Sequence, residues 1–142
     1  MKVSEWLAIQ AGKTAVADAD LSIKQLAATF LAHPALRDLY IVSRQGEILG
    51  HIRHHRLAQI LLSEHLPVQP HRQIMERLFG STAREIMESD FVSAHPDEEL
   101  DNVIHRMLEY RVDDMPVING ANQIIGNINL TDIMRASQDG GL

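Results

Sequence analysis

Short β-rich runs of apolar residues come in pairs along the chain. Residues 115–118 and 124–128 flank a connector rich in Gly and Asn, which tolerate the positive φ angles of tight turns, so this stretch predicts a β-hairpin. The same pattern over 38–52 predicts a second hairpin, which turns at Ser-Arg-Gln-Gly, residues 43–46. Each hairpin leads directly into a segment with helical spacing, so each strand pair is expected to end at a helix start.

Helices are predicted where apolar residues recur three or four positions apart. Two of them cover about 21–32 and 54–64. A third covers about 96–110, where Pro96 and the acidic residues after it have the composition of a helical first turn. The shorter predicted elements are helices at 4–11, 72–79, 82–87 and 130–137 and strands at 14–17 and 91–94.

Two further predictions concern residues that flank these elements. Thr82 and Glu85 have capping-box spacing for a short helix, and its apolar end at Ile86 is expected to pack on the unit that follows. Asp113 and Asp114 precede a strand and are expected to be exposed charges, with a ligand or cation role as the alternative.

The hairpin and its flanking helices occur twice. A shift of 76 positions aligns Asp38 with Asp114 and Gly50 with Gly126, without a gap over 19 residues. The apolar positions between these pairs keep their character, so the chain is a tandem repeat of strand, helix, hairpin and helix. The predicted organisation is an N-terminal helix at 1–13, a first repeat at 14–66, a linker at 67–81, a second repeat at 82–137 and a tail at 138–142.

The composition narrows the classes of function. The chain has no cysteine, which excludes disulfides, thiol catalysis and cysteine-ligated zinc. Its net charge of −6 argues against nucleic-acid binding, which needs clustered cations. The apolar runs are far shorter than the roughly 20 residues of a membrane helix, so we expect a cytoplasmic protein with no direct membrane insertion. No nucleophile, P-loop or paired-acid motif is present, so we expect no enzyme activity.

The second repeat resembles a CBS domain, and the whole chain resembles the CBS domain pair called a Bateman module. The matching segments are residues 83–87, 92–93, 96–97, 115–118 and 126–132. The last of them is similar to the family's Gly-hydrophobic-x-Thr/Ser-x-x-Asp pattern. The resemblance implies an α+β fold, with tandem CBS (β-α-β-β-α) repeats packed through their sheets about a pseudo-twofold axis, and a homodimer.

The resemblance also implies a cleft for an adenosine-containing ligand, with AMP, ADP, ATP and S-adenosylmethionine as candidates and no required cofactor. Asp132 would hold ribose hydroxyls, and Asn129 would occupy the Thr/Ser position near phosphate. A carboxylate can accept two hydroxyl hydrogen bonds, and N–H groups at a helix start favour anions, so this chemistry is sensible in its own right. The other candidate ligand-binding residues are Thr131, Ser93, His95, Met115 and Pro116.

The first repeat departs from the family pattern. Arg53 stands at the Thr/Ser position and Arg56 at the aspartate position. Arginine only donates hydrogen bonds, so it cannot accept from ribose hydroxyls. The first cleft is therefore expected to bind no nucleoside, to bind a bare anion with the help of His51 and His54, or to supply guanidinium groups to phosphates in the neighbouring cleft.

Other interpretations of the same residues stay open. Asp132 is also explained as an acidic residue in a helical first turn, and Met115 as a core residue. The histidines invite a metal-binding interpretation, but their spacing matches no recognised ligand pattern; they are His51, His54, His55, His65 and His71. The sequence thus predicts a regulatory nucleotide sensor for an unknown effector protein. A ligand-free dimerisation scaffold and a histidine-based metal or anion binder are the alternatives.

Overall fold

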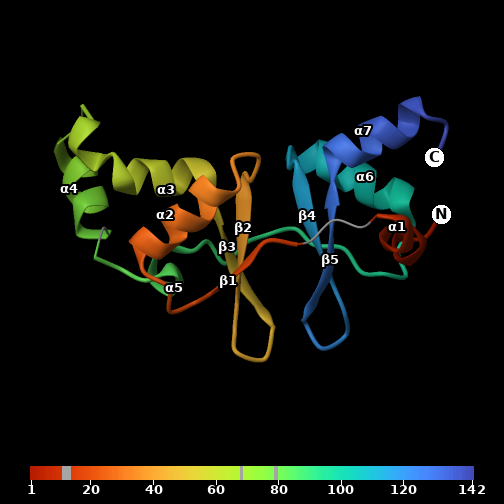
Figure 1. The fold of residues 1–142 in the computed structure, drawn as a ribbon, viewed down its shortest axis with the longest axis horizontal. Helices are drawn as coiled ribbons and strands as arrows, with labels where there is room; N and C mark the ends of the chain where they lie inside the picture. The colour runs from red at the N-terminus through yellow and green to blue at the C-terminus, as the bar shows by residue number, and fades with distance from the viewer. Residues whose placement is uncertain (11–13, 68, 79) are drawn as a thin grey trace. The chain divides into compact units, whose positions relative to one another are not determined.

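The computed structural model of the chain describes residues 1–10, 14–67, 69–78 and 80–142, without the side chains of residues 69–71 and 76. It forms two compact units (Figure 1). The central unit is Ala15–Phe91, and the terminal unit joins Met1–Thr14 to Val92–Leu142. The predicted repeat boundaries are defined by similarity along the sequence, whereas these units are defined by contacts in space. The repeat boundaries therefore stay a prediction.

The central unit contains a three-stranded sheet. Its strands are β1 (Val16–Asp18), β2 (Asp38–Val42) and β3 (Ile48–Arg53), in the order β1-β2-β3. Strand β1 runs parallel to β2, which requires a crossover connection, and α2 (Ile23–Ala32) supplies it. Strands β2 and β3 are antiparallel and form the predicted first hairpin, which is confirmed.

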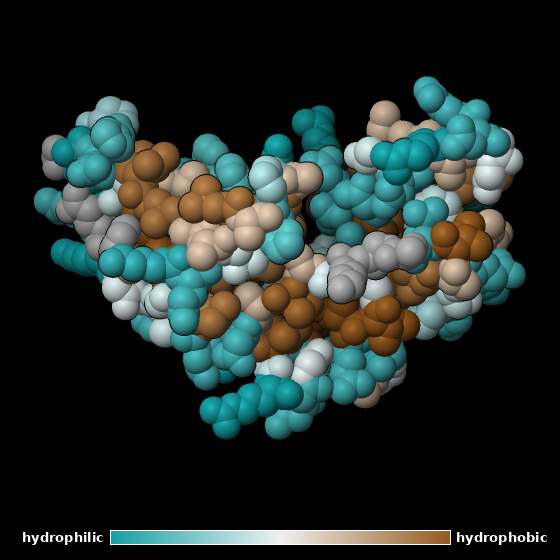
Figure 2. All heavy atoms as spheres, viewed as in Figure 1, coloured by the Kyte–Doolittle hydropathy of each residue, from teal (hydrophilic) through white to brown (hydrophobic). Residues whose placement is uncertain are grey.

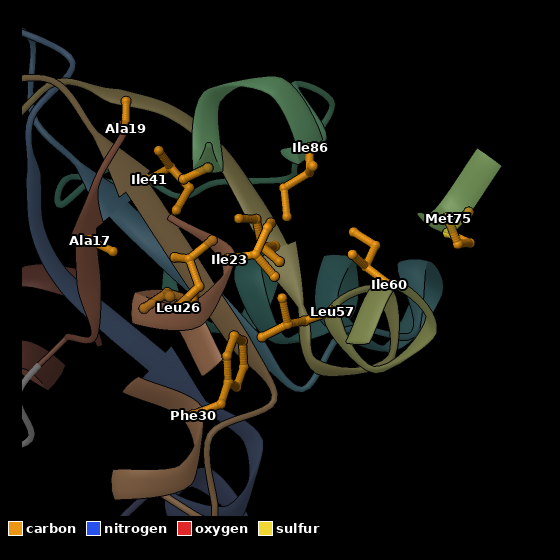
Figure 3. Close-up of a cluster of buried hydrophobic side chains, with 13 residues drawn as sticks. Ala17, Ala19, Ile23, Leu26, Phe30, Ile41, Leu57, Ile60, Met75 and Ile86 are labelled. Atoms are coloured by element: carbon orange, nitrogen blue, oxygen red, sulfur yellow. The ribbon is translucent and has the colours of Figure 1, made fainter. Parts of the chain in front are cut away.

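Helices cover this sheet. Helix α3 (His54–Leu61) gives way to a 3₁₀ turn (Ser63–His65), and α4 (Gln69–Leu78) and α5 (Ala83–Ile86) follow. The prediction of a helix from 72 is confirmed for residues 72–78, and its end at Phe79 lies outside the described residues. Buried side chains from the sheet and all four helices form one apolar cluster, which includes Ile23, Ile41, Leu57, Ile60, Met75 and Ile86 (Figure 3).

Helix α5 belongs to the central unit rather than to the unit that follows. Its capping box is confirmed, since the Glu85 carboxylate accepts from the Thr82 backbone N–H at 3.2 Å. The prediction that Ile86 packs on the next unit is wrong, because Ile86 is 1% exposed in the central cluster. The reason is that the Ala83 and Arg84 amides donate to the carbonyls of Leu21 and Ala19, at 2.8 and 2.9 Å, which fixes α5 beside the β1–α2 connection.

The terminal unit contains a two-stranded sheet, the predicted second hairpin. Antiparallel strands β4 (Asp114–Ile118) and β5 (Ile124–Asn129) pack with α1 (Val3–Ile9), α6 (Leu100–Tyr110) and α7 (Leu130–Gln138). The predicted end of the first helix at Ala11 lies outside the described residues. The core of this unit is Val3, Trp6, Ala94, Leu100, Val103, Met107, Met115, Val117, Ile128 and Ile133.

Two predicted elements of the terminal unit differ from the structure. The segment 91–94 is not a strand; it forms one isolated bridge, in which Ala94 pairs with Val117. The helix predicted from Pro96 begins at Leu100. The cause lies far away in the sequence, because the Val3 and Ser4 amides donate to the carbonyls of Glu98 and Pro96, both at 2.9 Å, so the N-terminal segment takes bonds that an earlier helical turn would need.

A bilayer would need a longer and more apolar helix than any that the described residues form.

Candidate functional site

The start of α7 carries the two central residues of the predicted ligand site. Asn129 is the N-cap, and its side-chain Oδ1 accepts from the Thr131 and Asp132 amides at 2.9 and 3.3 Å. Asp132 lies in the first turn of the helix, with 36% of its side chain exposed. Its Oδ1 accepts from Arg135 Nη1 at 2.9 Å. The structure therefore brings an amide, a carboxylate and a guanidinium group together at one helix start.

Asp114 holds this arrangement in place. Its Oδ1 accepts from the side-chain amides of Asn127 and Asn129, each at 2.8 Å. The prediction that Asp114 is simply an exposed charge is wrong, because its side chain is half-buried and bonded twice. The strand register explains this, since Asp114 lies directly opposite Asn129 in the β4–β5 pair. The carboxylate thereby orients Asn129 with its Nδ2 toward Asp114 and its Oδ1 toward the helix N–H groups.

Ser93 and His95 lie in the segment before α6, which is braced by an Arg–Glu pair. Arg106 donates to the Ser93 carbonyl at 2.7 Å and also to the Glu98 carboxylate. Glu98 in turn accepts from the His95 backbone N–H at 2.7 Å. The hydrogen bond from Arg106 holds the pKa of Glu98 below its ordinary value, with help from the His95 amide, so this carboxylate stays ionised. The His95 side chain is exposed.

Met115 and Pro116 lie on β4 and are buried. Met115 is 0% exposed and belongs to the apolar core of the terminal unit. The structure therefore supports the interpretation of Met115 as a core residue, and its role beside a ligand base stays a prediction. The Pro116 carbonyl accepts from the Ala94 amide at 2.9 Å. This backbone group of β4 is therefore already hydrogen-bonded within the protein.

In the first repeat, two of the four candidate anion-binding residues already have acidic partners. The Nδ1 atom of His51 lies 2.9 Å from the Asp38 carboxylate, and its Nε2 lies 3.1 Å from the Asp90 carbonyl oxygen. Arg53 donates to the Glu88 carboxylate at 2.6 Å. Asp38 and Glu88 thus compensate the positive charges of His51 and Arg53, which the sequence analysis proposed for binding an anion.

The other two candidates sit in the first turn of α3. The ring of His54 makes an edge contact with Phe30, at 5.7 Å between ring centroids. The Nε atom of Arg56 is buried and has no hydrogen-bond partner among the described residues. Of the four side chains, only Arg56 thus keeps a buried donor that an incoming acceptor would satisfy.

The pKa of His51 is raised above its ordinary value. Burial alone would lower it, because an apolar environment disfavours the charged ring. The hydrogen bond and charge of Asp38, the Asp90 carbonyl and the charge of Glu88 together outweigh burial. His51 is therefore held toward its protonated form by a structural pair.

The histidine metal-binding alternative has no supporting geometry in the described part of the chain, where no three His, Asp or Glu side chains are placed to share an ion. The side chain of His71 lies outside the described residues.

Comparisons with known proteins identify the fold. Residues 83–139 match the family model of the CBS domain. A solved CBS domain-containing protein from Thermotoga maritima is 27% identical, with a TM-score of 0.78, over 99% of this chain and 96% of that one. The CBS domain pair of protein MJ0100, solved in complex with 5′-methylthioadenosine and S-adenosyl-L-methionine, is 24% identical, with a TM-score of 0.73, over 99% and 98% of the two chains.

A curated relative is much longer. It is the L-aspartate semialdehyde sulfurtransferase of Methanocaldococcus jannaschii, which is 26% identical over 119 residues. The match covers 84% of this chain but only 20% of the relative, so the chain spans about a fifth of that protein's length.

Residues 83–139 are therefore a CBS domain, and the chain has the mixed α+β fold of CBS-domain pair proteins. The family resemblance and the fold class predicted from the sequence are confirmed. The packing of the two sheets about a pseudo-twofold axis stays a prediction.

Proposed function

We propose that the chain is a regulatory module that binds an adenosine-containing ligand at the start of α7 and carries out no reaction of its own. The observation that carries this proposal is the cap arrangement, in which Asp114 orients Asn129 and Asn129 fixes the first turn that presents Asp132. A carboxylate held at such a turn can accept both hydroxyls of a ribose.

The ion pair between Asp132 and Arg135 does not oppose this role. The two side chains are 36% and 66% exposed, and a pair of residues three or four apart on an exposed helix contributes only about 0.3–0.5 kcal/mol. Two hydrogen bonds from ribose to a charged acceptor are each worth about 1.5–3 kcal/mol, so a ligand can displace the guanidinium group. No described residue donates to the second oxygen of Asp132, which leaves it available.

The cap also argues for a ligand with little negative charge at this point. The Thr131 and Asp132 amides, which a phosphate would otherwise use at a helix start, already donate to Asn129. Asp114 and Asp132 add negative charge beside them. Among the candidates, S-adenosylmethionine therefore suits the site better than AMP, ADP or ATP. The complex of the related MJ0100 pair with S-adenosyl-L-methionine and 5′-methylthioadenosine supports this order.

Calorimetric titration of the whole chain with S-adenosylmethionine, 5′-methylthioadenosine, AMP and ATP tests the proposal. The two ligands without phosphate are expected to bind more tightly than ATP. The variant Asp132→Ala is expected to weaken binding at least about tenfold, since a hydrogen bond to a charged group is lost. Asp139→Ala is the matched control, because Asp139 lies at the opposite end of α7. Equal affinity in both variants would reject the assignment of Asp132.

A second candidate function is a dimerisation scaffold that needs no ligand. Several helices carry apolar side chains that are more than half exposed; they are Leu31 on α2, Ile74 on α4, Leu108 and Tyr110 on α6, and Met134 on α7. Apolar residues reach the surface over the helices of the central unit (Figure 2). Such residues suit contact with a second copy of the chain. A homodimer by light scattering, together with no heat from any of the four ligands, would favour this function over the sensor.

A further inference from the structure

A pocket of about 280 Å³ opens in the central unit at the turn of its hairpin. It is lined by residues 18–20, at and after the end of β1, by residues 42–45, at the end of β2 and in the β2–β3 turn, and by Arg84 of α5. None of these residues is among those that the sequence or the family resemblance assigned to ligand binding. We call it the turn pocket.

The topology of the sheet places these three segments together. Because β1 and β2 are parallel, both strands end at the same edge of the sheet, where the hairpin also turns. The Arg84 amide donates to the Ala19 carbonyl at 2.9 Å and so brings α5 to this edge. Strand β3 leads from the turn to α3 at the opposite edge, so the turn pocket is separate from the Arg53–Arg56 segment. It also lies in a different unit from Asp132.

Two guanidinium groups in the turn pocket, those of Arg44 and Arg84, have no side-chain partner in the described part of the chain. Among the described residues, no carboxylate lies within ion-pair distance of Arg44 or Arg84, and no acceptor is hydrogen-bonded to either side chain. The Ser43 hydroxyl oxygen accepts from the Glu47 amide at 3.2 Å, which leaves its proton free to be donated. The pocket therefore holds three side chains with donor groups, Ser43, Arg44 and Arg84, that no described residue accepts from.

The acidic residues of the turn pocket form no ion pair with these arginines among the described residues. Asp18 accepts from the Asp20 backbone N–H at 2.8 Å and so closes the turn after β1. Both carboxylates remain exposed to solvent on the same rim as Arg44 and Arg84. Positive and negative side chains thus line one pocket without an ion pair between them in the residues described. A small molecule that carries both an oxyanion and hydrogen-bond donors would pair with both kinds of side chain.

We propose that the turn pocket binds a small molecule through an oxyanion, a phosphate or a carboxylate, held between Arg44 and Arg84 and the Ser43 hydroxyl. The planar fork of arginine matches both oxyanions with two parallel hydrogen bonds. The volume of about 280 Å³ is just below the roughly 300–1,000 Å³ of pockets for drug-sized ligands, so the ligand is small. Asp18 and Asp20 accept from hydroxyl or amino groups on the same molecule.

The test is a titration of the ¹⁵N-labelled full chain, at constant ionic strength, with inorganic phosphate and separately with malonate. We expect amide shifts at residues 18–20, 43–47 and 84, and an affinity at least tenfold weaker in the double variant Arg44→Gln, Arg84→Gln. Arg77→Gln is the matched control, because Arg77 is another exposed arginine of the central unit and is not in the pocket. The stronger of the two probes identifies the oxyanion.

Each outcome decides the proposal. Shifts that spread over all exposed arginines, equal affinity in the double variant and the Arg77→Gln control, or no binding of either probe would overturn it. If the double variant is not folded, Arg44→Lys with Arg84→Lys keeps the charge and loses the fork, and it must still weaken binding. Asp132→Ala must leave these shifts unchanged, so failure of the adenosine-ligand proposal and failure of this one give different results.

Discussion

The two hairpins have the same strand pairing, but the polar residues at their matching positions make different contacts. Each begins with an aspartate, Asp38 or Asp114, that bonds a side chain 13 residues later on the neighbouring strand. In the central unit that partner is His51, and in the terminal unit it is Asn127. The aspartate of one hairpin therefore pairs with a titratable imidazole, whereas the aspartate of the other pairs with an amide, which carries no titratable proton.

The difference extends to the helix start after each hairpin. In the terminal unit, Asp114 also orients Asn129, which leaves Asp132 at the surface of α7. In the central unit, the position of Asn129 is taken by Arg53, which turns to Glu88 instead. The first repeat thus uses these polar groups to hold its own segments together, whereas the second leaves the Asp132 side chain 36% exposed at the start of α7. The same fold allows both arrangements, because the hairpin backbone determines where a side chain lies and the residue type determines what it can bind.

The largest expected effect comes from the matching glycines. A Cβ at Gly50 would lie 2.6 Å from the Glu88 carbonyl oxygen, whereas at Gly126 it would lie 2.7 Å from a methyl group of Leu7. The Glu88 backbone is fixed by two hydrogen bonds with His51, at 2.9 and 3.0 Å, while a leucine side chain can rotate away. We expect Gly50→Ala to lower the free energy of unfolding by about 1–3 kcal/mol, and Gly126→Ala by less than about 1 kcal/mol.

Urea denaturation followed by circular dichroism measures both glycine variants. Equal losses of stability would mean that the 88–90 segment yields as easily as the Leu7 side chain. That result would show that the backbone hydrogen bonds with His51 do not hold residues 88–90 in place.

The next effect is a pH dependence confined to the central hairpin. Since the pKa of His51 is raised in the folded state, its stabilisation is complete below the unfolded value of about 6.5 and is lost as pH rises through the folded pKa. The charged groups that face the ring are Asp38 and Glu88. We therefore expect the free energy of unfolding of the wild type to fall as pH increases above about 6.5, and the fall to be smaller in His51→Asn.

His51→Asn copies the partner found in the terminal hairpin, so it is the sharpest variant for this test. The measurement is the difference between the wild-type and variant unfolding free energies, determined from pH 5.5 to 8.5 by urea titration. The remaining histidines contribute equally to both proteins and cancel. A difference that stays constant, or that grows in the opposite direction, would contradict the raised pKa.

The sequence was sufficient for the elements whose causes are local. Both hairpins follow from β-rich runs around turn residues, and the start of α7 directly after β5 follows from the helical spacing that begins there. The role of Asp114 needed the register of two strands, because nothing in the segment itself says that it lies opposite Asn129. The signal in the sequence was that both aligned aspartates, Asp38 and Asp114, are followed 13 positions later by a polar residue on the neighbouring strand.

Long-range contacts explain what the sequence did not predict. The late start of α6 depends on amides of Val3 and Ser4, more than 90 positions away, and no local propensity contains that information. The assignment of Ile86 to the central core depends on backbone bonds to residues 19 and 21. The same limit applies to the first-repeat anion site, since Arg53 looked available only while Glu88 was not known to face it.

The smallest expected effect concerns the two Arg–Glu pairs, one in each unit. Arg53 and Glu88 are 60% and 38% exposed, whereas Arg106 and Glu98 are 30% and 27% exposed. An exposed ion pair contributes about 0.2–1 kcal/mol because water and salt screen it, so Arg53→Gln should lower the unfolding free energy by no more than that. Arg106→Gln should cost more, since it also removes a hydrogen bond to the Ser93 carbonyl.

Urea titrations of the two arginine variants in 50 mM and 500 mM NaCl separate these contributions. The small effect of Arg53→Gln should vanish at high salt, while most of the Arg106→Gln effect should persist because part of it is not a charge interaction. An Arg53 effect as large and as resistant to salt as that of Arg106 would show that the first repeat depends on this pair to hold the 88–90 segment. The polar positions of the central hairpin would then be essential to its folding, and the loss of the family's ligand residues there would have a structural cause.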